Sequence, residues 1–509
     1  MSIRNIVFVK KENSFKLSEA KFCEMTDYLR NSSSHSLKLS ELEIYVKLNG
    51  SELLRRLLAG HLNERGVGDV GPSVIGSDGV NRTHKRIRAR TIKTLFGKIE
   101  IFRVGYSNRN SSSLFPLDAM LNLPPVNISY VLQKNLILEI IKSSFDESVA
   151  SVERWTEVKI TTRQAKKIVL KAAIDFEEFY EHKRNSVTID TIKLPLIILT
   201  CDGKGIVMRY EDLREATKKR AAKRIKNIDN KVKGATDKKT DSKRMSTVAS
   251  VYEIDRFVRK PENICKELFK KSDSEIKIKR PSPVSKRVWA SIEKTAENTI
   301  RKMFEEASQR PGSDKKEWVA VVDGDLNQIN KIKSHSRQFN KNVVIICDII
   351  HVSKYVWKAG KVLNEKQKVK QWVSERFELI LKGKSSLVAS GMRRSATFRK
   401  LEKTEREPID ICARYLLNHV DYLHYDEYLR LGYPIATGVI EGACRYLVKD
   451  RMGITGARWS LEGAEALLKL RSLKVSGDFT AYWIFYENNQ YDRNYNVRYQ
   501  DPSILKTSS

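Results

Sequence analysis

Short apolar runs alternate with amphipathic stretches along this chain, and the alternation predicts both strands and helices. In residues 1–60 apolar positions recur at helical spacing, with a polar, serine-rich break at 31–36. The segment R-T-I-K-T-L-F-G-K-I-E-I-F-R-V-G-Y instead alternates apolar and polar residues on both sides of Gly97. Because alternation places successive side chains on opposite faces of a strand, this segment predicts a β-hairpin.

Two helix starts are visible between residues 144 and 181. Ser144 and Glu147 form the S-x-x-E pattern of a capping box, and Thr161 and Gln164 form the related T-x-x-Q pattern. The pair predicts a helix-turn-helix; a plain helical hairpin with a solvated basic face explains it equally well. The candidate contacts to phosphates and base edges, on the first turns of the second helix, are Arg163, Gln164, Lys166 and Lys167.

Three apolar runs further on are each followed by an aspartate. The runs are 194–201, 318–322 and 343–347, and the aspartates are Asp202, Asp323 and Asp348. Their richness in Ile and Val is typical of strands that are covered on both faces. We further expect strands at 206–209 and 246–254, a helix at 285–306, a short helix through 329, and a long helical stretch at about 352–430.

The expected order is therefore strand, strand, strand, helix, strand, helix, strand, helices. This is the order of an RNase H-like core, in which three strands form an antiparallel meander and two later strands run parallel to the first. The fold class predicted is α/β: an RNase H-like mixed-sheet catalytic core with a helical insertion, preceded by helical and hairpin DNA-binding regions.

Charge narrows the range of partners. The 509 residues include 94 Lys and Arg against 62 Asp and Glu, a formal net charge of +32. Such a balance favours a polyanionic partner, usually nucleic acid, over the alternative of a well-solvated basic protein. The segment 214–244 is especially basic, and we expect a loop that tracks a DNA backbone, with a solvated, disordered segment as the alternative.

Two compositional features bear on the compartment. No apolar run approaches the roughly 18 residues of a spanning helix, so no membrane association is expected, and residues 1–10 do not resemble a signal peptide. The six cysteines are scattered and form no C-x-x-C pair, so neither a zinc site nor a disulfide framework is indicated. We expect a reducing, cytoplasmic location, associated with the nucleoid.

Carboxylates at strand ends are candidates for metal-assisted phosphoryl transfer. In the proposed sheet the first and fourth strands are neighbours, so Asp202 and Asp323 are expected side by side. Two Mg²⁺ ions can stabilise the attacking and leaving oxygens of an in-line displacement, and two or three carboxylates suffice to hold them. Asp348 is the alternative to Asp323, one strand further from Asp202. Each aspartate taken alone is more often a turn residue or a helix cap.

A helix-like stretch, T-G-V-I-E-G-A-C-R-Y-L-V-K, supplies a third acid. Glu441, Arg445 and Lys449 recur every four residues and share a polar face, opposite an apolar side. They predict either a helix-stabilising salt bridge or an acid on metal with cations on nearby phosphates. Further candidate DNA contacts are Arg451, Arg458, Trp459 and His351, although a buried tryptophan is an equal alternative for Trp459.

These segments resemble DDE transposases of bacterial insertion sequences, specifically the Kra-type group. The most specific stretch is Y-P-I-A-T-G-V-I-E-G-A-C-R-Y-L-V-K-D-R-M, continued by T-G-A-R-W and G-A-E-A-L-L-K-L-R. Similar shorter motifs are C-D-G-K-G, K-R-M-S-T-V-A-S-V-Y, V-V-D-G-D and C-D-I-I-H-V. The resemblance covers residues 82 to 475; it departs from the family at Met452-Gly453, where a basic residue is usual.

The resemblance implies a transposase that cleaves DNA at the ends of its element and transfers the strands into target DNA. It implies dependence on Mg²⁺, with Mn²⁺ as an alternative, recognition of terminal inverted repeats, and metal binding by Asp202, Glu441 and one later aspartate, for which strand order favours Asp323. A homodimer or larger synaptic complex is expected because two ends must be paired. The alternatives are a non-catalytic DNA-binding protein derived from a transposase, and an RNase H-like nuclease without strand transfer.

The domains expected are an N-terminal helical region at 1–80, a hairpin and helix-turn-helix-like DNA-binding region at 81–190, a catalytic domain at 191–475 containing the basic loop 214–244 and a helical insertion at 355–430, and a C-terminal tail at 476–509.

Overall fold

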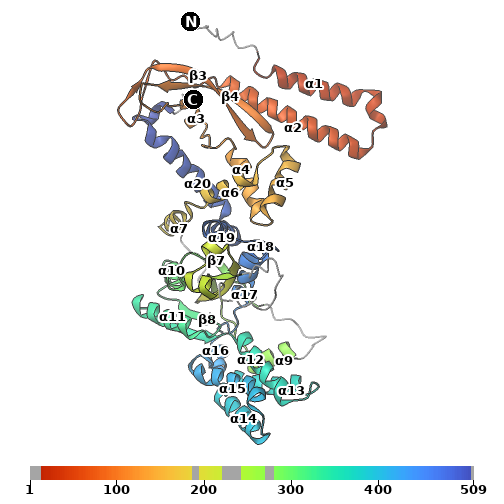
Figure 1. Ribbon diagram of the computed structural model, residues 1–509, viewed down its shortest axis with the longest axis vertical. Helices are drawn as coiled ribbons and strands as arrows, with labels where there is room; N and C mark the ends of the chain where they lie inside the picture. Colours follow the sequence, from red (N-terminus) through yellow and green to blue (C-terminus); the bar gives the residue numbers. More distant parts are fainter. Residues whose placement is uncertain (1–12, 186–193, 221–241, 270–279, 506–509) are drawn as a thin grey trace, which may run out of the picture. The chain divides into compact units, whose positions relative to one another are not determined.

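The computed structural model describes residues 13–185, 194–220, 242–269 and 280–505. These divide into two compact units. The first unit combines residues 1–175 with residues 480–509, and the second spans residues 176–479. The segment expected as a C-terminal tail thus contributes the helix α20 (Phe479–Asn494) to the same unit as residues 1–175 (Figure 1).

A helical pair and a β-hairpin open the first unit. The helices α1 (Lys16–Arg30) and α2 (Leu39–Glu64) lie side by side, joined through the short 3-10 helix η1 (Ser32–Ser36) (Figure 1). The strands β3 (His84–Thr94) and β4 (Gly97–Ser107) pair along their whole length, and Gly97 has a φ of 117°, which favours glycine at this turn. Both the helical region and the hairpin are as predicted.

The first unit continues with a cluster of short helices. They are α3 (Pro116–Met120), α4 (Tyr130–Ile140), α5 (Phe145–Thr156) and α6 (Thr162–Ala172), and α4, α5 and α6 pack against one another. Both predicted capping boxes are confirmed: Ser144 caps α5 and Thr161 caps α6. The link between these two helices contains Glu157 in the left-handed region, which ends α5 sharply.

The second unit is built on a mixed five-stranded sheet. Its strands are β5 (Leu196–Val207), β6 (Lys243–Ile254), β7 (Val284–Ser291), β8 (Glu317–Val322) and β9 (Val343–Cys347). Their order is β7-β6-β5-β8-β9; β6 is antiparallel to both of its neighbours, β5 and β7, while β8 and β9 run parallel to β5. The predicted arrangement, an antiparallel meander of three strands followed by two strands parallel to the first, is found, but the meander consists of β5, β6 and β7 instead of the strands expected at 194–201, 206–209 and 246–254.

Two of the predicted elements are wrong. The strands expected at 194–201 and 206–209 are one strand, β5, because Gly203 and Gly205 stay paired with Thr247 and Met245 of β6. The helix expected over 285–306 is the strand β7 followed by the helix α10 (Ala296–Ser308). Residues 288–291 of β7 are buried, and a short buried run carries no periodicity that separates strand from helix.

Helices cover both faces of this sheet. On one face Phe304 of α10 packs near Trp318 of β8, with ring centroids 5.8 Å apart. On the other face Val319 and Val321 of β8 join a large apolar cluster. That cluster is built with the helices α12 (Ile349–Leu363), α13 (Val369–Leu381), α14 (Ser385–Phe398), α15 (Lys403–Asn418) and α16 (Tyr425–Arg430), which correspond to the predicted helical insertion.

The second unit also contains the helices α7 (Phe176–Asn185), α9 (Pro261–Phe269), α11 (Leu326–Gln338) and α19 (Leu461–Val475), and the interrupted helix that carries Glu441. Of the predicted basic loop 214–244, residues 221–241 lie outside the described residues, and the last two begin β6. Within the described ranges, no helix has both the length and the apolar character that crossing a membrane requires.

Candidate active site

Two of the predicted acids lie at the same end of neighbouring strands. The parallel pairing of β5 with β8 runs as far as Thr200 opposite Val321. Continued by two residues, the same register places Asp202 opposite Asp323. Both side chains are partly exposed. Burial, and then the charges of Asp323 and Asp202, raise the pKa of the Cys201 thiol, so both carboxylates lie within electrostatic range of one buried atom.

The position of Asp202 within its strand differs from the prediction. Asp202 is not the last residue of β5; the strand continues to Val207, paired with β6 alone. What ends just before Asp202 is the parallel pairing with β8. The aspartate therefore lies just beyond the end of that pairing and is partly exposed, while β6 keeps its backbone extended. Its Oδ1 accepts a hydrogen bond from the Gly203 N–H (2.6 Å).

The loop that carries Asp323 is held through its main chain. The carbonyl oxygen of Asp323 accepts a hydrogen bond from the Tyr415 hydroxyl (2.9 Å), and the carbonyl oxygen of Gly324 lies 2.7 Å from Nε2 of His419. Gly324 has a φ of 93°, and a Cβ there would clash with the Tyr415 hydroxyl. The carboxylate itself accepts only from the Asp325 N–H (3.0 Å) among the bonds of the described residues. The backbone is thus fixed while the carboxylate keeps acceptor capacity.

Glu441 lies on an interrupted helix. The helix α17 (Gly438–Ala443) continues as a π-helical segment, η4 (Cys444–Lys449), and then as α18 (Asp450–Met452). The predicted faces are confirmed: Glu441, Arg445 and Lys449 are exposed, and the intervening apolar side chains are buried. Single π-helical turns inside helices are uncommon and are frequent at functional sites.

A thiol joins this helix to the sheet edge. Sγ of Cys444 donates a hydrogen bond to Oδ2 of Asp202 (3.3 Å). Burial and the neighbouring Asp202 both raise the pKa of the Cys444 thiol, so the sulfur keeps the proton that this bond needs. This hydrogen bond fixes the helix that carries Glu441 against β5 at Asp202.

Glu441 points to a partner outside the aspartate pair. Its Oε1 lies 3.5 Å from Nζ of Lys354, and the two side chains are 49% and 55% exposed, so the ion pair contributes little stability. Among the described residues, no three His, Cys, Asp or Glu side chains come close enough together to hold a metal ion. Magnesium takes one or two carboxylates together with water and substrate phosphates, and Asp202 with Asp323 fits that requirement.

Asp348, the alternative to Asp323, has a different environment. It is 2% exposed, and its Oδ1 accepts from the Ile350 N–H (2.7 Å) at the start of α12. Its Oδ2 accepts from the Thr437 N–H (3.3 Å) and from the Thr437 hydroxyl. Burial raises the pKa of this carboxyl above its ordinary value, against the lowering effect of Thr437. The carboxylate joins α12 to the segment that precedes Glu441 and has no surface toward solvent.

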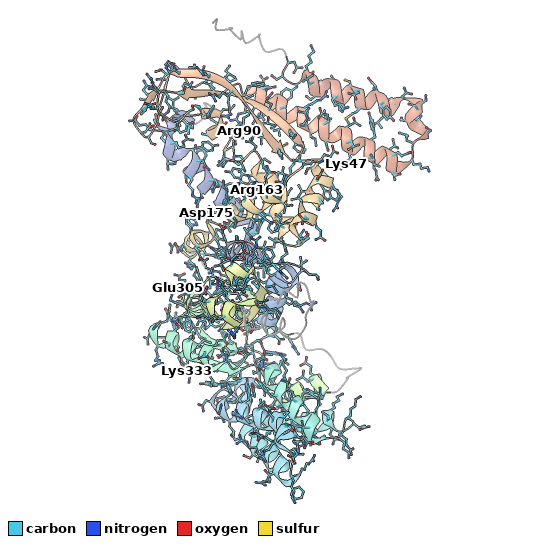
Figure 2. All side chains as sticks on the ribbon, in the orientation of Figure 1. Lys47, Arg90, Arg163, Asp175, Glu305 and Lys333 are labelled. Atoms are coloured by element: carbon cyan, nitrogen blue, oxygen red, sulfur yellow. The ribbon has the colours of Figure 1, made fainter. Side chains whose placement is uncertain are left out.

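The predicted helix-turn-helix contacts lie on the surface of the first unit. Arg163, Lys166 and Lys167 are exposed on α6, and Figure 2 labels Arg163. Lys166 lies over the ring of Phe145, 5.8 Å from its centroid. Gln164 is also exposed, but its Oε1 accepts from the Thr161 N–H (3.1 Å) in the capping box. Three cations on one helical turn remain oriented toward solvent.

The other predicted DNA contacts are divided between surface and interior. Arg445, Lys449 and Arg458 are exposed. Arg451 and Trp459 are 2% and 7% exposed and pack on each other, and the indole N–H donates to the Met452 carbonyl (3.1 Å). A ring buried in this way leaves no face for base stacking, so the interior alternative describes Trp459.

His351 is half-buried beside Tyr355 and Tyr415, with ring centroids 5.5 Å and 6.2 Å away. Tyr415 in turn stacks on His419 at 4.3 Å. Sequence reasoning missed Tyr415 and His419 entirely, because both act on the Asp323 loop across more than 90 residues. No local pattern marks such contacts.

The comparisons with known proteins are sparse. Neither a protein-family model nor a curated protein matches this sequence. Among solved structures, the chain is similar to the Drosophila P element transposase in its strand transfer complex, with a TM-score of 0.24 and 9% sequence identity over 78% of this chain and 85% of that one. A likeness this small carries no argument about fold or function.

Proposed function

We propose that this chain is a DDE-type transposase of the Kra-type group, a polynucleotidyl transferase with an RNase H-like core. The observation that carries the proposal is the strand register that places Asp202 opposite Asp323 just beyond the β5–β8 pairing, together with the hydrogen bond from Cys444 on the helix of Glu441 to Asp202. The strand order and directions of the sheet, together with the sequence motifs around these three acids, support the same assignment.

In this proposal Asp202 and Asp323 are the metal ligands, and Asp348 is structural. Two Mg²⁺ ions, or Mn²⁺ in their place, would stabilise the attacking and leaving oxygens of the phosphodiester at this edge. Asp202 presents its carboxylate beside the end of β8, and Asp323 presents its own from a loop fixed by Tyr415. Preorganised ligands of this kind need little rearrangement when substrate arrives.

Glu441 is the third acid of the proposal, and the exposed cations on its face contact the neighbouring phosphates. Arg445 and Lys449 lie one and two turns beyond Glu441 and are exposed with it. The pair between Glu441 and Lys354 is weak enough for DNA phosphates to replace the carboxylate as the partner of the lysine. Glu441 is then released to join the two aspartates.

The exposed cations of α6 serve the same proposal from the first unit. Arg163 and Lys167 contact the terminal repeats of the element, in the manner of a recognition helix whose first turn faces DNA. Because each phosphate contact releases counterions, the affinity for DNA is expected to fall steeply with salt.

One observation favours a second candidate, a non-catalytic DNA-binding protein. In the described part of the chain the three acids do not form a group able to hold a metal ion. A protein that kept its basic surfaces but did not bring the three acids together on a metal ion would bind the element ends and leave them uncut.

The test is strand cleavage and joining on DNA that carries the sequences flanking this gene, with Mg²⁺ or Mn²⁺. Wild type is compared with Asp202→Asn and Glu441→Gln, and the matched control is Glu462→Gln, an exposed acid on α19. Wild type and the control are expected to cut and join, while the two site variants bind DNA without cutting it. Binding without cutting by wild type would establish the second candidate, and cleavage without joined product would indicate a nuclease.

A further inference from the structure

Other elements of the first unit pack against parts of two sides of the helix α2. Toward α1, the ring of Tyr45 stacks on Tyr28 with centroids 4.2 Å apart, and the Arg56 guanidinium donates to the Leu17 carbonyl (3.1 Å). Toward the β-hairpin, Leu58 and Leu62 pack against the cluster that contains Ile99. These contacts anchor α2 firmly in the first unit.

The third side of α2 is apolar and uncovered. Val46 and Leu57 lie 7 and 18 residues beyond Leu39. These separations are close to two and five whole turns of an α-helix, so the three side chains fall in one stripe. Leu54 lies beside that stripe. All four side chains are between 40% and 73% exposed. We call these four residues the α2 seam; their exposure along a 26-residue helix is unusual in a protein that stands alone.

The helical pair differs from the rest of the chain in charge. Together α1 and α2 carry six Lys or Arg and seven Asp or Glu, in a chain whose formal net charge is +32. A near-neutral apolar surface does not attract DNA phosphates. It is also the part of the molecule where two equally basic copies approach each other with the least repulsion.

We infer that the α2 seam is a self-association surface on which the α2 helix of a second copy of this chain packs. Two helices of 26 residues, more than three heptads each, are long enough for a coiled-coil pair. Leu39, Leu42, Val46 and Leu53 follow the three-, four- and seven-residue spacing of such a pair, and Leu57 lies on the same side of the helix. The inference deepens the proposed function, in which two chains pair two DNA ends, but the contact itself needs neither DNA nor metal.

The experiment measures the self-association of the full chain by sedimentation, without DNA and in the presence of a chelator. The seam variant is Val46→Glu combined with Leu57→Glu. The control is Ile44→Glu combined with Leu48→Glu, which also replaces two exposed apolar residues of α2. The control side is different: Ile44 lies 18 residues before Leu62, on the side that faces the hairpin.

Wild type and the control are expected to dimerise equally. The seam variant is expected to associate about a hundredfold or more weakly, because four apolar side chains per dimer are replaced by charges that repel. Thermal unfolding, monitored by circular dichroism at a concentration where all the proteins are monomeric, should give the same midpoint for the three, since the replaced side chains are exposed.

A wild type that stays monomeric across micromolar concentrations would overturn the inference, as would a seam variant that dimerises like wild type. Equal weakening by the control and the seam variant would place the contact elsewhere on α2 and would also overturn it. Failure of DNA cleavage leaves each of these outcomes unchanged, so the proposed function and the seam are tested separately.

Discussion

The ends of β8 and β9 have the same local sequence pattern and opposite chemistry. Each is an apolar strand followed by an aspartate and then by a helix. After β8, Tyr415 and His419 bind main-chain oxygens, and the Asp323 carboxylate is left partly exposed. After β9, the Asp348 carboxylate itself accepts hydrogen bonds from the N–H groups of Ile350 and Thr437. The difference teaches that a strand-end aspartate is available for chemistry only when other groups satisfy the backbone around it.

Replacing each aspartate in turn is the sharpest way to break this comparison. Asp323→Asn is expected to lower the cleavage rate by at least about a hundredfold, since a metal ligand accounts for several kcal/mol of transition-state stabilisation. Asp348→Asn should cut at close to the wild-type rate when folded. Single-turnover cleavage rates of the two variants on DNA that carries the element ends measure the difference. If only Asp348→Asn is inactive, the strand-order argument that favours Asp323 is wrong.

For stability, the loop after β9 should be more sensitive to loss of its aspartate than the loop after β8, the reverse of the order expected for cleavage. Asp348→Ala is expected to lower the free energy of unfolding by about 1–3 kcal/mol, because it leaves the buried N–H of Thr437 unpaired and removes the cap of α12. Asp325→Ala removes the exposed cap of α11 and should cost about 1 kcal/mol. Urea unfolding measures both. Equal costs would mean that the burial of Asp348 adds nothing.

Tyr415→Phe tests whether the hydrogen bond from the Tyr415 hydroxyl to the Asp323 carbonyl oxygen positions the Asp323 carboxylate. The variant removes the donor to the Asp323 carbonyl and is expected to cost about 1 kcal/mol of stability. It should also raise the Mg²⁺ concentration needed for half-maximal cleavage without abolishing cleavage, since the carboxylate is still present. An unchanged Mg²⁺ requirement at reduced stability would show that Tyr415 supports the fold alone. Tyr422→Phe, near the same helix end, serves as the control.

The smallest expected effect is a pH dependence. Burial raises the pKa of Asp348 above the ordinary carboxyl value, so between those two values the native state holds a proton that the unfolded state has lost. The unfolding free energy of wild type minus that of Asp348→Asn is therefore expected to fall as the pH rises through this interval. Urea titrations from acid to neutral pH measure the difference. A rise instead would mean that the bonds from Thr437 outweigh burial.

The sequence predicts the sheet of this protein better than the lengths of its strands. Apolar runs around Ile198, Val319 and Ile345 identify three strands correctly, and the capping boxes at Ser144 and Thr161 place two helix starts. The strand β7 is missed because its buried part, residues 288–291, has no polar face that would mark a strand. The continuity of β5 through Gly203 is missed because glycine is read as a turn when the partner strand is unknown.

The candidate site divides in the same way. The polar face of the Glu441 helix follows from four-residue spacing and is confirmed. The contacts that separate Asp323 from Asp348 come from Tyr415 and Thr437, which lie about 90 residues away in the chain. Burial of Arg451 and Trp459 is likewise a property of packing. Local patterns predict which residues share a face, and only the folded chain determines which of them reach solvent.

The helix that carries Glu441 can lose one residue in its π-helical segment, 444–449, and remain a helix. A π-turn accommodates one residue more than an α-turn, so deleting a single residue there would restore regular α-helix without breaking the element. The deletion would rotate Glu441 by about 100° relative to the buried pair of Arg451 and Trp459. At this position evolution can therefore redirect an acid through a one-codon loss or gain, a change that no substitution at Glu441 itself would reproduce.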